Sequence, residues 1–208
     1  MKNLILVGGG GHCKSVIDIA ECLGYNILGI LDRHEEKGKR VLNYEIIGED
    51  ADMGRLADQA EFLVTVGQIK SPELRIRLHR HLAEAGCRLA TIIAPTAHVS
   101  RYAKIGEGTV VMHQAVVNAD AKVGHGCIIN TLANIEHDTI IDDYCHISTG
   151  AMINGGARIE AGTFIGSQSV VNQGITICSE VVVASLSVVN RDITKKGVYA
   201  GTPAAIIK

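Results

Sequence analysis

The stretch IEHDTIIDDYCHISTGAMI, residues 135–153, has an isoleucine at every sixth position and a small residue four positions after each of the first three. Valine or isoleucine keeps this spacing without a break from Ile93 to Val189, over seventeen hexads. The small position is Ala, Thr, Cys or Ser in thirteen successive hexads, from Ala97 to Ser169, and the pattern then loosens. A period of six is typical of a parallel β-helix, in which each hexad supplies one short strand and one turn. Three successive hexads then form one triangular coil with the branched side chains inside.

The first part of the chain, up to residue 92, instead alternates between strand and helix patterns. Short aliphatic runs predict strands, and apolar residues at helical spacing predict two helices. The second helix has Ser71 as its N-cap, Pro72 at its first position and Gly86 at its C-terminal end. Alternating elements of this length indicate a small parallel sheet with helices on its faces. The predicted strands are 4–8, 26–32, 62–67 and 88–93, the predicted helices are 12–25 and 71–86, and residues 33–49 are predicted to be a polar loop.

The composition argues against several classes of function. The net charge is −2, only 3% of residues are aromatic and no basic run is present, so we expect no nucleic-acid binding. No apolar run approaches the roughly 20 residues of a membrane-spanning helix, and the N-terminal apolar run is too short for a signal peptide. We therefore expect a cytoplasmic protein that does not contact membranes. The six cysteines form no CxxC pair, which favours buried reduced thiols over disulfides or a zinc site.

Four motifs together resemble those of a known family. They are LILVGGGGH at 4–12, IEHD at 135–138, HISTGAMINGG at 146–156 and GVYAGTPA at 197–204. Over essentially its whole length the chain resembles the two-domain hexapeptide-repeat sugar acetyltransferases. That family includes bacterial UDP-4-amino-sugar N-acetyltransferases of the bacillosamine, perosamine and legionaminic acid pathways and the so-called sialic acid O-acetyltransferases.

The resemblance implies a fold, a donor and an assembly. The fold is a Rossmann-like α/β domain followed by a left-handed parallel β-helix, the donor is acetyl-CoA, no metal is needed, and the protein is a homotrimer with three shared sites. The implied divisions are a nucleotide-sugar-binding α/β domain at 1–92, a β-helix acetyltransferase domain at 93–194 and a C-terminal tail near the cofactor at 195–208.

Three histidines, His113, His125 and His137, occupy the same place in their hexads. Acetyl transfer needs a base to take a proton from the nucleophile, and histidine has a suitable ordinary pKa. Only His137 lies between two acids, Glu136 and Asp138, and a carboxylate can orient the imidazole and stabilise its charged form. The bacillosamine enzymes have Glu where this chain has the shorter Asp138. By resemblance, the catalytic residues are His137 as general base, Asp138 as its orienting acid, and Asn130 and Glu136 in the same site.

The three-hexad coil predicts what lies beside His137. Ala119 is one coil earlier and Gly155 one coil later, and both are small enough to leave a slot beside the imidazole. Gly155 and Gly156 are candidates for the passage of the pantetheine arm, because backbone without a Cβ admits a ligand alongside it. The resemblance adds three cofactor-binding candidates: His146 at the acetyl end, Ser167 and Ala184.

The glycine run before His12 suggests a phosphate site. Backbone N–H groups between a strand and a helix can approach a phosphate, and Asp32 follows about 20 residues later, where a ribose or base could be held. A dinucleotide enzyme is disfavoured because Cys13 replaces the last glycine of the fingerprint and the unit has few strands. The resemblance implies a UDP-sugar site, whose candidate residues are Gly8, Gly10, Gly11, His12, Asp32, Gly67 and Gln68.

The expected reaction is N-acetylation of a UDP-4-amino-deoxysugar by direct attack on acetyl-CoA, in bacterial surface-glycan or glycoprotein sugar biosynthesis. Cys127 and Cys145 occupy interior places of their hexads, so no acyl-enzyme is expected. Two alternatives are O-acetylation of a sialic-type sugar and a non-catalytic β-helix that binds a nucleotide sugar. A metal-dependent hydratase is disfavoured because a spacing of two hexads puts the three histidines on different faces.

Overall fold

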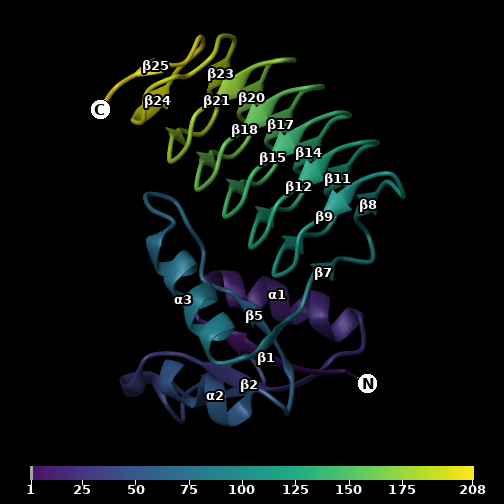
Figure 1. Cartoon of the computed structure of the whole chain (residues 1–208), viewed down its shortest axis with the longest axis vertical. Coiled ribbons are helices and arrows are strands. Elements are labelled where there is room, and N and C mark those ends of the chain that lie inside the picture. The colour runs from purple at the N-terminus through teal and green to yellow at the C-terminus, as the bar shows by residue number, and fades with distance from the viewer. Residues whose placement is uncertain (1) are drawn as a thin grey trace. The chain divides into compact units, whose positions relative to one another are not determined.

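The chain forms two structural units in the computed structural model, which describes residues 2–208 (Figure 1). One unit holds the residues up to Gly67 together with Glu73–Pro95, and the other holds Gln68–Pro72 together with Thr96–Lys208. The short segment Gln68–Pro72 therefore belongs structurally to the second unit although part of the first unit follows it in the chain.

The first unit is built on a sheet with the strand order β3-β4-β2-β1-β5-β6. All neighbouring strands in it are parallel except β3 and β4. The central strand β1 is buried along Leu4–Val7, as expected for a parallel strand covered on both faces. The strands are β1 (Asn3–Val7), β2 (Asn26–Leu31), β3 (Arg40–Val41), β4 (Tyr44–Gly48), β5 (Glu61–Val64) and β6 (Arg88–Leu89), followed by β7 (Ile92–Ile93). The helices are α1 (Gly11–Cys22), α2 (Met53–Leu56) and α3 (Glu73–Glu84), with 3₁₀ turns at His34–Glu36 and Asp50–Asp52.

The polar loop predicted for residues 33–49 is wrong. This segment forms β3 and β4, and Ile46 of β4 is buried and pairs with Ile30 of β2. The strand pattern was hidden because β3 is only two residues long and the surrounding sequence is rich in charged residues. The second predicted helix begins later than expected, at Glu73, after both Ser71 and Pro72.

The second unit is a parallel β-helix with three faces, each a sheet of two-residue strands. The first face contains β10 (Val110–Val111), β13 (Ile128–Ile129), β16 (His146–Ile147), β19 (Phe164–Ile165) and β22 (Val182–Val183). The second face contains β8 (His98–Val99), β11 (Val116–Val117), β14 (Asn134–Ile135), β17 (Met152–Ile153), β20 (Val170–Val171) and β23 (Val188–Val189). The third face contains β9 (Lys104–Ile105), β12 (Lys122–Val123), β15 (Ile140–Ile141), β18 (Arg158–Ile159) and β21 (Thr176–Ile177).

The predicted three-hexad coil is confirmed by the strand pairing. Val117 pairs with Ile135, and Ile135 pairs with Ile153, each three hexads further along the chain. From Val111 to Val189 the aliphatic hexad side chains are at most 5% exposed, so they fill the interior. The predicted α/β unit followed by a parallel β-helix is therefore correct.

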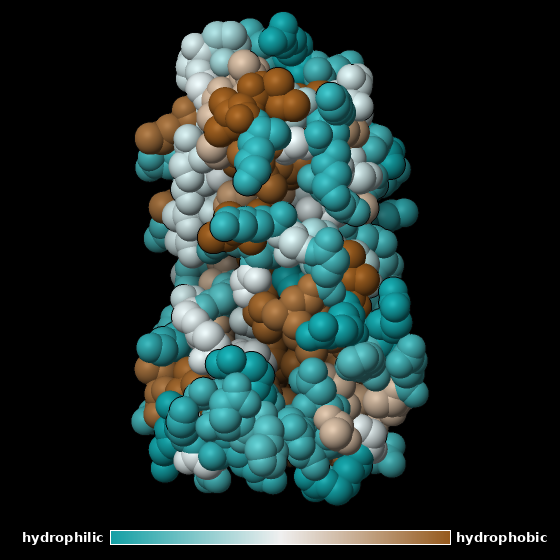
Figure 2. All heavy atoms as spheres, turned by 90° about the vertical axis from the view of Figure 1, so that its left-hand side faces the viewer, coloured by the Kyte–Doolittle hydropathy of each residue, from teal (hydrophilic) through white to brown (hydrophobic). Residues whose placement is uncertain are grey.

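The C-terminal residues continue the first face of the β-helix. β24 (Val198–Ala200) pairs in parallel with β22, and β25 (Ala205–Ile206) returns antiparallel to β24. Val182 pairs with Val198, so the offset becomes shorter than three full hexads where the hexad pattern has been lost. Figure 2 shows apolar side chains at the surface near this end of the β-helix, where Ile206 is 49% and Ile207 65% exposed.

The cysteines of residues 2–208 are all free thiols. Cys127 and Cys145 are completely buried inside the β-helix, as the hexad pattern predicts. Cys22 is exposed on α1, so the expectation of burial does not hold for every cysteine. Within the described residues, no helix has the length and apolar character needed to cross a membrane.

Neighbouring isoleucines of β15 provide a test of the interior position. Ile141 is 1% exposed, whereas Ile140 points outward and is only half-buried. We expect Ile141→Ala to lower the free energy of unfolding by about 2–5 kcal/mol through lost burial and a residual cavity, and Ile140→Ala to lower it by less than half as much. Urea unfolding followed by circular dichroism measures both losses. Equal losses would contradict the assignment of Ile141 to the interior.

Candidate active site

His137 lies in the turn between β14 and β15, at the edge where the second and third faces meet. We call this the His137 edge, formed by residues 118–121, 136–139, 154–157 and 172–175. The ring Nδ1 of His137 is 2.7 Å from Oδ2 of Asp138. Asp138 has a φ of 60°, the left-handed conformation that ends the turn. The shorter aspartate therefore reaches the imidazole.

The Asp138 contact fixes the electrostatics of the histidine. The hydrogen bond that Asp138 accepts raises the pKa of His137, and desolvation lowers it by a smaller amount. The negative charges of Asp138 and Glu136 add to the rise, so the net shift is upward. A carboxylate only accepts hydrogen bonds, so Nδ1 carries the ring proton and donates a hydrogen bond to Asp138. The ring is 64% exposed, and Nε2 has no hydrogen-bond partner among the described residues. The geometry leaves the Nε2 lone pair open to take a proton.

Gly155, one coil after His137, makes room for the ring. A Cβ at this position would lie 2.8 Å from both Cε1 and Nε2 of His137, which is closer than real contacts allow. The backbone of the next coil also holds the turn, because the N–H of Gly156 donates to the carbonyl of His137 at 2.9 Å. His137 and the two glycines therefore lie next to each other, as predicted, and only backbone borders the imidazole on the side of Gly155.

Glu136 adds a second carboxylate at the same edge. Its two oxygens accept hydrogen bonds from the side-chain amides of Asn134, at 3.0 Å, and Asn118, at 3.1 Å. The Asn134 bond is the largest cause that lowers the pKa of Glu136. The carboxylate therefore stays ionised beside His137 and favours the charged imidazolium.

Asn130 and His146 are not beside His137 in the same chain. Asn130 lies at the edge between the first and second faces, which we call the Asn130 edge, formed by residues 112–115, 130–133, 148–151, 166–169 and 184–187. Its Nδ2 is 3.1 Å from Nε2 of His146, the first residue of β16. Nδ1 of His146 is 2.7 Å from the carbonyl oxygen of Gln68. Because a carbonyl accepts only, Nδ1 donates to Gln68, and Nε2 accepts from Asn130.

The remaining cofactor candidates divide between the two edges. Ser167 lies at the Asn130 edge, where its hydroxyl is 3.0 Å from that of Ser148. Ala184 is at the same edge, and its carbonyl accepts a hydrogen bond from Ser169 at 2.8 Å. Gly155 and Gly156 are at the His137 edge. The predicted catalytic and cofactor-binding residues of one chain therefore fall into two separate groups, one near each edge, which we call the two half-sites of the prediction.

The other two histidines of the hexad series occupy the remaining edges. His113 is at the Asn130 edge, where its Nδ1 is 2.7 Å from the hydroxyl of Thr96, and His125 is at the edge between the third and first faces. The three histidines therefore lie on different edges, as the sequence predicts. Within residues 2–208, no group of three or more His, Cys, Asp or Glu side chains is placed to hold a metal ion.

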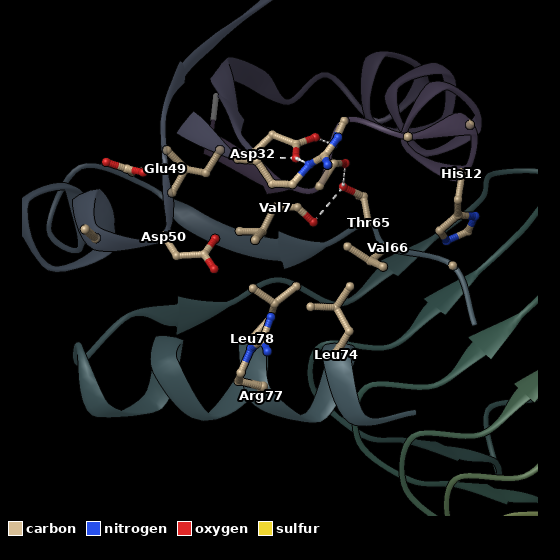
Figure 3. A pocket seen from close by; sticks show the side chains of 18 residues that line it. Val7, His12, Asp32, Glu49, Asp50, Thr65, Val66, Leu74, Arg77 and Leu78 are labelled. Atoms are coloured by element: carbon tan, nitrogen blue, oxygen red, sulfur yellow. Dashed lines mark hydrogen bonds and ion pairs between the residues drawn. The ribbon is translucent and has the colours of Figure 1, made fainter. Parts of the chain in front are cut away.

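A cavity of ≈ 660 Å³ opens in the α/β unit at the carboxyl ends of its parallel strands (Figure 3). Ligands of open parallel sheets bind at this edge, where successive strands diverge to opposite sides of the first strand. A Cβ on Gly10 or Gly11 would meet nothing within 4 Å, so this backbone faces open space at the start of α1. The predicted residues that line the cavity are Gly8, Gly10, Gly11, His12, Asp32 and Gly67.

Asp32 holds the glycine-rich turn in place. One of its carboxylate oxygens accepts a hydrogen bond from the Gly9 N–H at 2.6 Å, and the other accepts one from the Arg33 N–H at 2.7 Å. Gln68, in contrast, does not line the cavity. It is 3% exposed and its side chain donates to the carbonyl of Gly162 in the β-helix at 2.8 Å. The prediction that Gln68 closes this cavity is not supported by its position.

Sequence reasoning missed four charged residues of the cavity: Arg33, Glu49, Asp50 and Arg77. The two acids follow β4, the strand that the sequence did not reveal, and Arg77 lies on α3. Burial raises the pKa of the Asp50 carboxyl, and the positive charges of His81 and Arg77 oppose this shift. Recognising β4 from the residues around Ile46 would have placed both acids at the same sheet edge as Asp32.

The three-hexad coil defines the chain as a hexapeptide-repeat β-helix protein with an exposed, acid-bound histidine at one edge. Comparison with known proteins refines this class. Residues 3–82 match the model of the PglD N-terminal domain. The acetyltransferase domain of PglB from Neisseria gonorrhoeae FA1090 is 33% identical, with 100% of both chains covered and a TM-score of 0.92.

Two further relatives are named as sugar N-acetyltransferases. A mutant of GDP-perosamine N-acetyltransferase from Caulobacter crescentus, solved with CoA and GDP-perosamine, is 30% identical over 100% of this chain and 98% of that one, with a TM-score of 0.93. UDP-N-acetylbacillosamine N-acetyltransferase from Bacillus subtilis (strain 168) is 35% identical over 116 residues, which are 54% of this chain and 52% of that protein. The match thus spans about half the length of this curated relative. The chain belongs to the left-handed β-helix, hexapeptide-repeat sugar N-acetyltransferases, so the expected family of acetyl-CoA-dependent acetyltransferases is confirmed.

The His137–Asp138 contact gives a prediction for titration. We expect Asp138→Asn to lower the pKa of the His137 imidazole toward its ordinary value, because a neutral amide does not stabilise the imidazolium as a carboxylate does. Histidine NMR resonances followed against pH measure the change. Asp120→Asn is a matched control, since Asp120 has the equivalent left-handed turn position one coil earlier. An unchanged His137 pKa in Asp138→Asn would rule out the proposed electrostatic coupling.

Proposed function

We propose that this protein transfers the acetyl group of acetyl-CoA to the 4-amino group of a UDP-linked deoxysugar, with His137 as the general base. The observation that carries the proposal is the 2.7 Å contact between His137 Nδ1 and Asp138, which leaves the exposed Nε2 available. Acceptors of this kind, nucleotide-linked amino sugars, are named for the relatives of this chain.

The chemistry follows from the protonation states at the His137 edge. As the amine nitrogen attacks the thioester carbonyl, its N–H proton passes to Nε2 of His137, and Asp138 and Glu136 stabilise the resulting imidazolium. When the C–S bond breaks, the imidazolium returns this proton to the thiolate of CoA. The products are the N-acetyl sugar and free CoA. Cys127 and Cys145 are too deeply buried to form an acyl-enzyme.

The base works only in its neutral form, which gives the sign of the pH dependence. Asp138 raises the pKa of His137, so activity is lost as the pH falls through this raised value. The half-site around His137 fits the acetyl donor because Gly155 has no Cβ. A Cβ at this position would collide with the imidazole. Gly155 and Gly156 at this edge would border the pantetheine arm, and the resemblance assigns the acetyl end to His146, which contacts Asn130 beside the other edge.

The α/β cavity would bind the nucleotide. The open backbone of Gly10 and Gly11 at the N-terminus of α1 suits the pyrophosphate, because unpaired N–H groups and the helix dipole favour negative charge. Asp32, at the end of β2, lies where an acidic side chain can contact the ribose. His12 and Gly67 lie on the other side of the glycine turn and would border the sugar.

A homotrimer would unite the two half-sites. The outward residues of the second face are mainly apolar, including Val116, Val170, Val188 and the 49% exposed Met152. The third face instead carries charged outward residues, Lys104, Lys122 and Arg158. The second face is bordered by both edges. If copies pack through this face around a threefold axis, the His137 edge of one subunit meets the Asn130 edge of the next.

Substitution of the base tests the proposed reaction. We expect His137→Ala to lower kcat about 10²- to 10⁴-fold, the usual contribution of a general base. His125→Ala is the control, because His125 has the same hexad place but lies at another edge and is exposed. Thiol release from acetyl-CoA is measured with UDP-4-amino sugars and with free sialic acids.

Each of these assays can overturn one part of the proposal. Retention of most activity in His137→Ala would exclude His137 as the base. Acetylation of sialic acid hydroxyls with no reaction of the amino sugars would replace N-acetyl transfer by O-acetyl transfer. Binding of nucleotide sugars without any thiol release would identify a non-catalytic binding protein.

Subunit mixing tests the shared site. His137→Ala and Asn130→Ala should each be nearly inactive, but mixed oligomers of the two variants should regain activity at interfaces that pair an intact His137 edge with an intact Asn130 edge. Mixtures of His137→Ala with the double variant His137→Ala/Asn130→Ala serve as the control and should stay inactive. A monomer in sedimentation analysis, or no recovery in the first mixture, argues against a site shared between subunits.

A further inference from the structure

The large cavity of the α/β unit has one end that differs chemically from the rest. The carboxylate of Asp50 and the side chain of Arg77 reach this end from opposite walls, one from the turn after β4 and the other from α3 (Figure 3). His12 lies at the other end of the cavity (Figure 3). Neighbouring Glu49 has a carboxylate oxygen 3.5 Å from Nδ1 of His34. The main-chain carbonyl of Asp50 accepts a hydrogen bond from the Met53 N–H, and its side-chain carboxylate makes none with the described residues. A hydrogen-bond acceptor and a donor thus both line this end of the cavity, with no hydrogen bond between them.

The order of strands indicates which part of a nucleotide would meet this pair. The pyrophosphate belongs at the glycine turn after β1, and the ribose at Asp32 after β2. β4 is the next strand beyond β2 in the sheet, and Asp50 is the second residue after its end. A ligand extended from the glycine turn past Asp32 therefore brings its nucleobase, and not its sugar, to Asp50 and Arg77. The opposite end of the ligand extends toward His12 and Gly67 on the β5 side.

We propose that Asp50 and Arg77 are the specificity-determining residues that recognise the nucleobase, through a ring N–H next to a ring carbonyl. The Asp50 carboxylate accepts the hydrogen bond of the ring N–H, and the Arg77 guanidinium donates to the adjacent carbonyl oxygen. Uracil offers this edge at N3–H and O4, and guanine offers it at N1–H and O6. This inference rests on the proposed function, because it assumes that the cavity binds the nucleotide of the substrate.

The same pair excludes the other two common bases. Cytosine and adenine have an unprotonated ring nitrogen where uracil and guanine have N–H, and an amino group where they have a carbonyl. Their lone pair would face the Asp50 carboxylate, and their amino group would face the cationic Arg77. Polar groups left without partners in a partly buried site lower the affinity by about tenfold, which corresponds to about 1.4 kcal/mol. Repulsion of the wrong base would thus supply the specificity.

The test measures the binding of UDP, GDP, CDP and ADP to the full-length protein by isothermal titration calorimetry. We expect UDP, GDP or both to bind at least about tenfold more tightly than CDP and ADP. In Asp50→Asn this preference should shrink to less than about threefold, because an amide can turn either its oxygen or its NH₂ toward the ring nitrogen. Arg77→Met, at an exposed position, should weaken UDP and GDP but not CDP. Asp58→Asn, exposed and outside the cavity, is the matched control.

The outcomes separate this inference from the proposed function. Equal binding of all four nucleotides, or an unchanged preference in Asp50→Asn, overturns the role of Asp50 while leaving the acetyl-transfer proposal intact. Failure of all four to bind removes the nucleotide site and this inference together, and thiol release with amino sugars then decides whether the acetyltransferase proposal survives. If UDP binds more tightly than GDP, the cavity prefers uracil; if GDP binds more tightly, it prefers guanine.

Discussion

The constant offset of three hexads between paired strands is the constraint on which the β-helix and its candidate active site depend. Because β14 pairs with β17 one coil later, residues such as His137 and Gly155 are stacked by the backbone itself. The same offset sets Asn118 beside Glu136. An insertion of one residue in any coil would turn interior side chains outward and separate these pairs. The surroundings of His137 are therefore fixed by the register of the scaffold.

The two units use different physical means to place functional groups. In the β-helix, the interior hexad positions hold branched or small side chains, so polar side chains lie at the edges and on the outward faces. His137 is exposed at one edge, where Asp138 adopts the left-handed conformation. In the α/β unit, carboxyl ends of parallel strands bring residues from distant parts of the chain to one cavity. We propose that the first arrangement performs the acetyl transfer and that the second selects the nucleotide.

The sequence predicts the β-helix almost completely because its signal is local and repeated. The contact of His137 with Asp138 could also be predicted from the sequence, since the two residues are adjacent in the chain. The missed features depend on packing over long distances: β4 joins the sheet through Ile46 despite its charged surroundings, and Asp50 follows it into the cavity. Gln68 ends beside the β-helix because the carbonyl of Gly162, far along the chain, accepts its amide hydrogen bond. No local pattern reports such a contact.

A crystal structure of the protein with CoA and a UDP-4-amino sugar is the most direct test of the assignment of His137. We expect the acceptor amine to lie within about 3.2 Å of His137 Nε2, the reach of a general base, with the pyrophosphate against the backbone of Gly10 and Gly11. An acceptor amine held by a different side chain, with His137 Nε2 facing solvent, would contradict this assignment.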